Sequence, residues 1–386
     1  MAIEDLKNIK RELETELFNS VIPFWQKHSI DKVNGGYYNC LDSRGNIFDT
    51  TKYMWLHGRQ IWMFSKLYNN HYQNDEWLQI ATHGIEFMKN NAKLENGRVY
   101  FSLNETGQPV YLQRKVFSEC FFAMALSEYG KAKQDESYIA EAKSTLQRIW
   151  KMIQDPLLVG RPIYKGESSF QTLAVPMILL NLIEEIYGTQ FKEVEKEVYE
   201  CIDKIKKHCK NGLVYENVLK NGDLVDSSEG RLLNPGHAIE AGWFLLRWSQ
   251  LLNDLPLMDT GKNMIRNMFD LGWDNEFGGL YYFLDANNCP PAKLEWNMKL
   301  WWPHCESLYA FLLLYTITNE KEDFDTFLKV KNYCFTHFRD KEYGEWFGYL
   351  NRDGSVSLSL KGGPYKGCFH LPRALFNCIA AIENLK

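Results

Sequence analysis

The sequence lacks the local motifs of several large enzyme classes. Its 386 residues contain no GxGxxG and no GxxxxGK[ST], so the glycine loops that hold dinucleotides and phosphates are absent. GxSxG and HExxH are absent as well, and with them the usual local signals of acyl transfer and zinc hydrolysis. The chemistry must therefore be sought in residues that lie far apart in the chain.

Basic tracts, cysteine pairs and long apolar runs are also missing. The net charge is −5 without a basic cluster, which gives no footprint for nucleic acid or an anionic membrane. The nine cysteines are odd in number and include no CxxC, which indicates reduced thiols rather than a disulfide framework. No run approaches the roughly 18 apolar residues of a membrane span, and the charged N-terminal segment lacks the apolar core of a signal peptide. We therefore expect a soluble, cytoplasmic protein.

What recurs instead is a short segment in which glycine precedes aromatic and β-branched residues. Because glycine and asparagine supply the positive φ that tight turns need, each copy predicts a small hairpin. The copies are about 60 residues apart except for one gap of about 115, which places a degenerate copy near Leu158–Tyr164. The clear copies are NGGYY at 34–38, NGRVYF at 96–101, NGLVY at 211–215, FGGLYYF at 277–283 and YGEWFGY at 343–349.

Between the hairpins, apolar residues recur at intervals of three and four, which predicts amphipathic helices. Each unit of roughly 60 residues has room for two helices and a hairpin, so about six units fill the chain. Such units bury their apolar faces only against neighbours, and nothing resembles the polar capping repeat of an open solenoid. We predict an all-α fold in which residues 1–386 form a single (α/α)6 barrel, with short β-hairpins and the functional site at one end.

The segment NPGHAIEAGWF opens one predicted helix. Asn234 is the expected N-cap and Pro235 the first helical residue, which places His237 in the first turn. Glu240 follows three residues later on the same face. The positive end of the helix dipole favours a neutral imidazole, and a neutral imidazole is a competent general base near pH 7. A histidine that only caps or packs is the alternative.

A second helix entry lies in GGPYKGCFHLPRALF. Pro372 marks the helix start, and His370 stands just before it on a loop whose glycines permit close backbone approach. Arg373 follows and could fix an oxygen of a substrate. A surface loop histidine is the alternative, but two histidines in the same setting favour a functional pair.

Two further helices contribute polar residues to apolar surroundings. In KLWWPHCESLYAFLL, Trp302 and Glu306 share a face, whereas His304 is about 200° round from Trp302. We interpret His304 as structural, which weakens a metal site built from several histidines. In WLHGRQIWMF, Arg59 lies within an apolar helix, where a charge is paired or functional unless it faces solvent.

Together these segments resemble the N-acylglucosamine 2-epimerase family, whose animal members are also called renin-binding proteins. The resemblance runs the length of the chain, and the ordered set is specific although each piece alone is weak. The family has an (α/α)6 barrel, as the repeats predict. The segments that carry the resemblance are FWQKHSIDKVNGGYYNCL, KYMWLHGRQIWMFSKLY, NPGHAIEAGWFLLR, LWWPHCESLYAFL and KGCFHLPRALF.

The resemblance implies an isomerase of amino-sugar and sialic acid metabolism that interconverts N-acetylglucosamine and N-acetylmannosamine. In the family, the ring opens, one histidine removes the C2 proton to give an enediolate, and a second returns a proton to the other face. Matched by motif, His237 and His370 are that pair, and no redox cofactor or metal is needed. The other residues implied by the match are Glu240 and Glu306 as supports of substrate hydroxyls or of the histidines, Arg59 and Arg373 as oxygen ligands, and Trp302 as a sugar platform.

The resemblance also implies a homodimer and ATP as an allosteric activator, with the loop GRPIYKG as our suggestion for the ATP site. Related cellobiose 2-epimerases and aldose–ketose isomerases carry a further histidine on a middle helix. The corresponding stretch here, SSFQTLAVPMILL, has none, which favours the N-acyl branch.

Three alternatives stay open. The first is another sugar epimerase or isomerase of the mannose or cellobiose type. The second is a glycoside hydrolase that uses Glu240 and Glu306, because that chemistry needs two facing carboxylates. The third is a non-catalytic binding protein.

Overall fold

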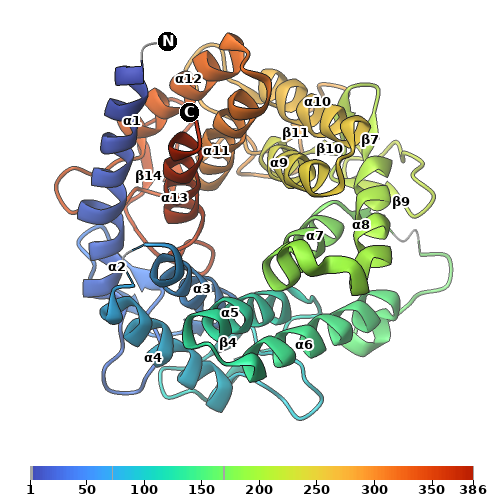
Figure 1. The fold of residues 1–386 in the computed structure, drawn as a ribbon. Helices are drawn as coiled ribbons and strands as arrows, with labels where there is room; N and C mark the ends of the chain where they lie inside the picture. The colour runs from blue at the N-terminus through green and yellow to red at the C-terminus, as the bar shows by residue number, and fades with distance from the viewer. Residues whose placement is uncertain (1–2, 72, 168–169, 386) are drawn as a thin grey trace.

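The helices of this protein form a closed ring of two layers, viewed along its axis in Figure 1. The computed structural model describes residues 3–71, 73–167 and 170–385. Within these residues, the inner layer consists of α3 (Met54–Asn70), α5 (Phe117–Lys133), α7 (Ala174–Tyr187), α9 (Pro235–Leu252), α11 (Trp301–Thr318) and α13 (His370–Glu383). The predicted all-α (α/α)6 barrel is confirmed.

Each inner helix has outer helices behind it. A π-helix at Leu17–Val21 joins α1 to α2, and short 3-10 helices occur at Pro156–Val159 and Gly188–Val194. The outer helices are α1 (Ile3–Glu16), α2 (Ile22–His28), α4 (Asp75–Asn91), α6 (Glu136–Gln154), α8 (Glu195–Lys207), α10 (Leu255–Gly272) and α12 (Lys321–His337).

The two layers bury different fractions of their surfaces, which explains the patterns in the sequence. Outer helix α8 buries only Val198, Cys201, Ile202 and Ile205, one stripe at intervals of three and four. Inner helix α11 is buried without interruption from Trp301 to Leu314, because it packs against other inner helices and against the outer layer. Inner helix α11 therefore has no exposed polar face in this stretch, so the buried polar residues on it stand out.

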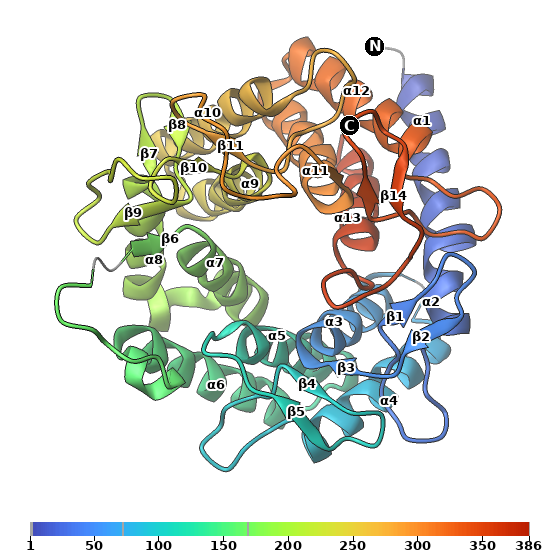
Figure 2. The ribbon, with the colours of Figure 1, turned by 180° about the vertical axis from the view of Figure 1, so that it is seen from behind.

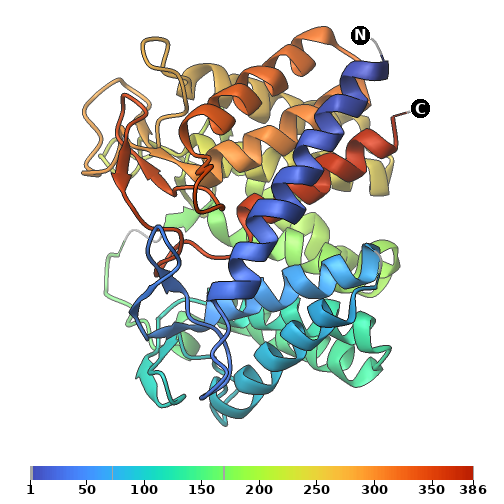
Figure 3. The ribbon, with the colours of Figure 1, turned by 90° about the vertical axis from the view of Figure 1, so that its left-hand side faces the viewer.

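Short antiparallel strands lie at one end of the ring, facing the viewer in Figure 2, while both termini lie towards the other end (Figure 3). Several inner helices begin directly after one of these strands, so their N-terminal turns meet at the hairpin end. The strands are β1 (Cys40–Leu41) with β2 (Ile47–Asp49); β3 (Lys52–Tyr53), β4 (Ser102–Leu103) and β5 (Pro109–Tyr111); β6 (Phe170–Thr172) with β9 (Asn217–Leu219); β7 (Cys209–Lys210) with β8 (Leu213–Val214); β10 (Leu232–Leu233) with β11 (Leu284–Asp285); and β12 (Lys299–Leu300), β13 (Tyr349–Leu350) and β14 (Val356–Leu358).

One predicted hairpin is wrong. The segment Leu158–Tyr164 runs from a 3-10 turn into an open loop without a strand. Pro156 and Pro162 cannot donate backbone hydrogen bonds to a ladder, and Leu158 is 51% exposed rather than packed. The strand pair of this unit is instead β6 with β9, three residues in register on each side.

Buried lysine–aspartate pairs fasten three of the hairpins. Lys52 Nζ lies 2.7 Å from Asp31 Oδ2 and 2.6 Å from the Gly35 carbonyl oxygen, at the first hairpin. Lys299 contacts Asp274 at 3.0 Å, and Lys361 contacts Asp340 at 2.9 Å. All three lysines are fully buried. The hairpin repeat in the sequence therefore corresponds to a repeated internal anchor.

Two histidines complete these anchors. His304 Nε2 accepts from the Leu280 backbone N–H at 2.9 Å, and its Nδ1 donates to the Leu300 carbonyl at 2.6 Å. His57 makes the equivalent pair of bonds to Tyr37 and Tyr53. Burial lowers the pKa of both imidazoles to about 3, so both are neutral. The interpretation of His304 as structural is confirmed.

All nine cysteines are free thiols, and seven of them are buried. Among the residues that the structure describes, no helix combines the length and the apolar character that crossing a bilayer requires.

Candidate active site

His237 stands at the N-terminal turn of α9 and is held by a carboxylate from outside the helix. The Asn234 side chain accepts from the His237 backbone N–H at 3.2 Å, so the predicted cap is present. His237 Nδ1 lies 2.9 Å from Glu216 Oε2, which comes from the turn between β8 and β9. Sequence analysis missed Glu216, because nothing in the local pattern connects it with a helix that begins 19 residues later.

The pKa of His237 is shifted in the direction opposite to the one predicted. Burial lowers the pKa of its imidazole, but the negative charge and hydrogen bond of Glu216, helped by Glu240, outweigh it, so the pKa is raised above 6.5. The predicted effect of the helix dipole does not prevail, because a carboxylate in hydrogen-bond contact acts more strongly than the end of a helix.

His370 is the first residue of α13, and it is paired in the same way with a different carboxylate. Its Nδ1 lies 2.6 Å from Glu306 Oε1. Burial lowers the pKa of His370 well below 6.5, and the positive charges of Arg59 and Arg373 lower it further. His370 is therefore a neutral imidazole, and the pKa values of the two histidines are shifted in opposite directions.

Arg373 joins the two carboxylates of the inner helices. Its guanidinium donates to Glu240 Oε1 at 2.6 Å and to Glu306 Oε1 at 2.7 Å. The second oxygen of Glu306 accepts from the indole N–H of Trp243 at 2.9 Å, a contact that sequence analysis also missed. Glu306 is thus held from three sides, which fixes the ring of His370 in turn.

The cluster has the donor set of a metal site but already contains a cation. Ligand atoms of Glu240, Glu306 and His370 all lie within 4.8 Å of one another. The Arg373 guanidinium donates to both carboxylates, so it supplies the positive charge that a metal ion would otherwise bring.

Arg59 is a buried cation with unused donors. Its guanidinium carbon lies over the rings of Trp55, Phe121 and Phe369, at 4.4, 4.0 and 5.0 Å from their centroids. It forms no hydrogen bond or ion pair with any residue that the structure describes, and its Nε is buried without a partner. Burial lowers the pKa of Arg59 to about 9, which still leaves it charged at neutral pH. A buried donor without a partner points to a ligand oxygen.

Trp302 packs against both histidines. Its ring centroid is 5.2 Å from that of His237 and 5.7 Å from that of His370, with both rings tilted by 40°. The residues predicted from the sequence, Arg59, His237, Glu240, Trp302, Glu306, His370 and Arg373, therefore come together at the hairpin end of the inner helices.

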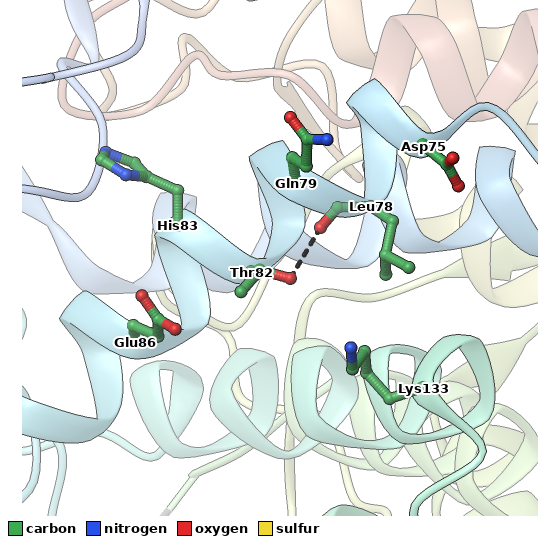
Figure 4. A pocket seen from close by; sticks show the side chains of 7 residues that line it. All are labelled: Asp75, Leu78, Gln79, Thr82, His83, Glu86 and Lys133. Atoms are coloured by element: carbon green, nitrogen blue, oxygen red, sulfur yellow. Dashed lines mark hydrogen bonds between the residues drawn. The ribbon is translucent and has the colours of Figure 1, made fainter.

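Two hollows lie away from the histidines. One, of about 460 Å³, is lined by Trp243, Arg373 and residues from the C-terminal halves of inner helices. The other, of about 410 Å³, lies on outer helix α4; Figure 4 shows Asp75, Thr82 and His83 on that helix with Lys133 across from them. The second hollow contains none of the predicted site residues.

This chain is similar to known proteins over nearly its whole length. The sequence profile of the N-acylglucosamine 2-epimerase (GlcNAc 2-epimerase) family matches residues 36–374. The chain is 42% identical to the N-acylglucosamine 2-epimerase of Bos taurus, over 99% of this chain and 93% of that protein. Among solved structures, a cellobiose 2-epimerase from Spirochaeta thermophila aligns with a TM-score of 0.83 at 21% identity, covering 99% of this chain and 98% of that one. A D-mannose isomerase gives a TM-score of 0.83 at 18% identity, covering 97% and 98%. The last two likenesses concern the fold alone.

Proposed function

This chain belongs to the N-acylglucosamine 2-epimerase family and is a sugar 2-epimerase, and from that premise we propose that His237 and His370 invert C2 between N-acetylglucosamine and N-acetylmannosamine. One observation carries the assignment. Two histidines, each held at Nδ1 by its own carboxylate, both pack against Trp302, and neither Nε2 has a hydrogen-bond partner among the described residues.

The geometry supports two proton transfers, in which one histidine removes the C2 proton and the other returns a proton to C2. In the ring-opened sugar, neutral His370 takes the C2 proton, and the electron pair moves onto the C1 oxygen to form an enolate, the counterpart of the enediolate of an ordinary aldose. Protonated His237 then gives its proton to the opposite face of C2, and the C1 carbonyl re-forms. Two groups are needed because inversion requires a proton donor and acceptor on opposite faces.

Arg59 is suited to the oxygen that becomes negative. Its charge is buried among aromatic rings, where an electrostatic interaction is stronger than in water, and within the described part of the chain none of its donors has a hydrogen-bond partner. Arg373, by contrast, donates from Nη2 to both Glu240 and Glu306, so it is already bound to the two carboxylates. We therefore propose Arg59 as the direct oxygen ligand and Arg373 as the residue that holds the two carboxylates, with Trp302 as the platform under the sugar.

The contacts of Arg373 with Glu240 and Glu306 also disfavour the glycoside hydrolase alternative. A glycosidase needs one carboxyl group that can be protonated to act as an acid beside a second that is charged. Arg373 Nη2 donates to both Glu240 and Glu306, at 2.6 and 2.7 Å, so a guanidinium nitrogen stands where the scissile bond would have to lie between them.

The proposed function predicts exchange of one hydrogen. In deuterated water, N-acetylmannosamine incubated with the enzyme should give N-acetylglucosamine that carries deuterium at C2, because the proton returned comes from a histidine in exchange with solvent. Proton NMR of the C2 position measures it. Conversion without deuterium at C2, or no conversion at all, would refute the mechanism.

Chelation should have no effect on the rate. Because Arg373 supplies the positive charge between Glu240 and Glu306, we expect kcat to stay unchanged after dialysis against EDTA. Added Mg²⁺, Mn²⁺ or Zn²⁺ should not raise it. A loss of activity with EDTA that Zn²⁺ restores would place a metal ion among these three ligands instead.

We further propose ATP as an allosteric activator that binds the loop GRPIYKG. The loop is exposed over residues 161–167 and presents Arg161 and Lys165, two cations suited to phosphate oxygens. The deuterium assay run with and without ATP tests activation, and Lys165→Ala should raise the ATP concentration needed for half-activation. A homodimer and a cytoplasmic location are also proposed, and sedimentation analysis of the purified protein tests the first.

A further inference from the structure

Glu216 differs from the other carboxylates of the site in where it comes from and in what it contacts. Glu240 and Glu306 project from inner helices and are joined by Arg373. Glu216 lies on the hairpin loop, its side chain is 12% exposed, and among the described residues the one hydrogen-bond partner of its carboxylate is His237. The two histidines are therefore held by unequal partners: His370 by a carboxylate shared with an arginine, and His237 by a carboxylate of its own.

The unequal partners have a consequence for the reaction. A histidine that donates from Nδ1 to an unshared carboxylate keeps Nε2 towards the substrate and is stabilised when Nε2 is also protonated. A carboxylate whose charge is offset by an arginine fixes the ring with much less gain for the imidazolium. One proton shared by the two histidines would then be found on His237.

We propose that Glu216 is a positioning residue that stores the working proton of the free enzyme on His237, leaving His370 as the resting base. The inference rests on the proposed two-histidine reaction, and it adds the residue that orients the pair. It follows that the free enzyme is ready for the epimer whose C2–H faces His370, and the other epimer reacts with the minor form in which the proton sits on His370.

The surroundings of His237 agree with this assignment. Burial opposes the charged form, and the carboxylates outweigh burial. Trp302 packs against the ring without a charge. The titratable groups near it are Glu216 from the β8–β9 turn, Glu240 from α9, His370 from α13 and Tyr282 from the segment before β11, whose pKa is raised by burial so that it stays neutral.

Glu216→Gln is the test, because glutamine keeps an acceptor for Nδ1 and removes the charge. The direction of the expected shift in the pH profile follows from the protonation states that activity requires. Activity needs one proton on the pair, and at high pH it falls as His237 loses that proton. Without the carboxylate the pKa of His237 drops, so the alkaline limb of kcat/KM against pH should move to lower pH while the acid limb stays in place.

Glu216→Gln should lower kcat/KM by a similar factor in both reaction directions. At pH 8 we expect kcat/KM to fall roughly 10- to 100-fold, the range typical of losing an outer partner of a functional histidine. Because an enzyme cannot change the equilibrium between the two sugars, the fall must be the same in both directions. Glu216→Asp, which restores a carboxylate, should return the alkaline limb towards its original position.

Glu229→Gln is the matched control. Glu229 lies in the segment between β9 and β10 and pairs with Lys293 at 2.9 Å, so this variant removes a nearby charge without touching His237. Its pH profile should match that of the unaltered enzyme. An unmoved alkaline limb in folded Glu216→Gln, or an equal shift in Glu229→Gln, would overturn the proposal.

A second readout does not depend on turnover. In ¹⁵N-labelled protein without substrate, the His237 ring should titrate above the ordinary histidine pKa of 6.5. It should titrate lower in Glu216→Gln or Glu216→Asp, with the larger change in the glutamine variant. If the enzyme epimerises nothing, the proposed function fails while this titration still decides the role of Glu216. If His237 titrates alike in every variant, only the role of Glu216 fails.

Discussion

Replacing His370 with alanine should abolish epimerisation and leave the barrel folded. A positioned general acid or base contributes about 10²- to 10⁴-fold to a rate, so kcat should fall at least that far. The fold should survive because Glu306, the partner of His370, keeps its bonds to Arg373 and to the indole of Trp243. His237→Ala should lose a similar factor. Product formation followed by NMR, with circular dichroism for folding, measures both variants.

Isotope exchange separates the two variants from simple damage. His237→Ala retains the base on one face, so it should exchange the C2 proton of one epimer with deuterated water and produce none of the other. His370→Ala should do the same for the opposite epimer. His83→Ala, on outer helix α4, is the control and should keep full activity. Full epimerisation by either site variant would show that the acid–base assignment is wrong.

Arg373→Met should be strongly destabilising. The variant leaves Glu240 and Glu306 buried without the cation that both of them contact. Removing one partner of a buried ion pair costs about 3–5 kcal/mol, because the remaining charge cannot recover its hydration. Denaturant titration gives the free energy of unfolding.

Arg59→Met is the matched comparison for that experiment. Arg59 is also a buried arginine on an inner helix, but it has no hydrogen-bond partner among the described residues and leaves no carboxylate unpaired. It should lose activity with little loss of stability. If both methionine variants are equally destabilised, the distinction between a structural Arg373 and a ligand-binding Arg59 does not hold.

The sequence alone predicted those parts of the molecule that depend on local pattern. The helices follow from apolar spacing, and the cap at Asn234 follows from the residues that surround it. The place of His304 followed from counting residues round a helix, and its bonds to Leu280 and Leu300 agree with that count. The hairpin expected at Leu158–Tyr164 failed because spacing indicates where a unit falls and not whether its strands form.

Partners that come from another unit could not be predicted in the same way. Glu240 was the natural partner of His237, since three residues along a helix bring two side chains to one face. In the structure Glu240 contacts Arg373, 133 residues away, and His237 contacts Glu216 on a loop. Only the closing of the ring determines which of these carboxylates reaches which histidine. The one available signal was position, since Glu216 directly follows the NGLVY hairpin segment.

The common direction of the inner helices has a consequence for what this kind of ring can catalyse. Their N-terminal turns gather at the hairpin end, and each contributes a partial positive charge there. Negative charge that develops on a reacting oxygen at that mouth is therefore stabilised before any single side chain is considered. The ring therefore stabilises anionic intermediates in general. The anchored hairpins above it can differ in sequence, and so in the sugar that they admit. A change of substrate should then require new turns, while a change of reaction requires new residues in the first turns of the helices.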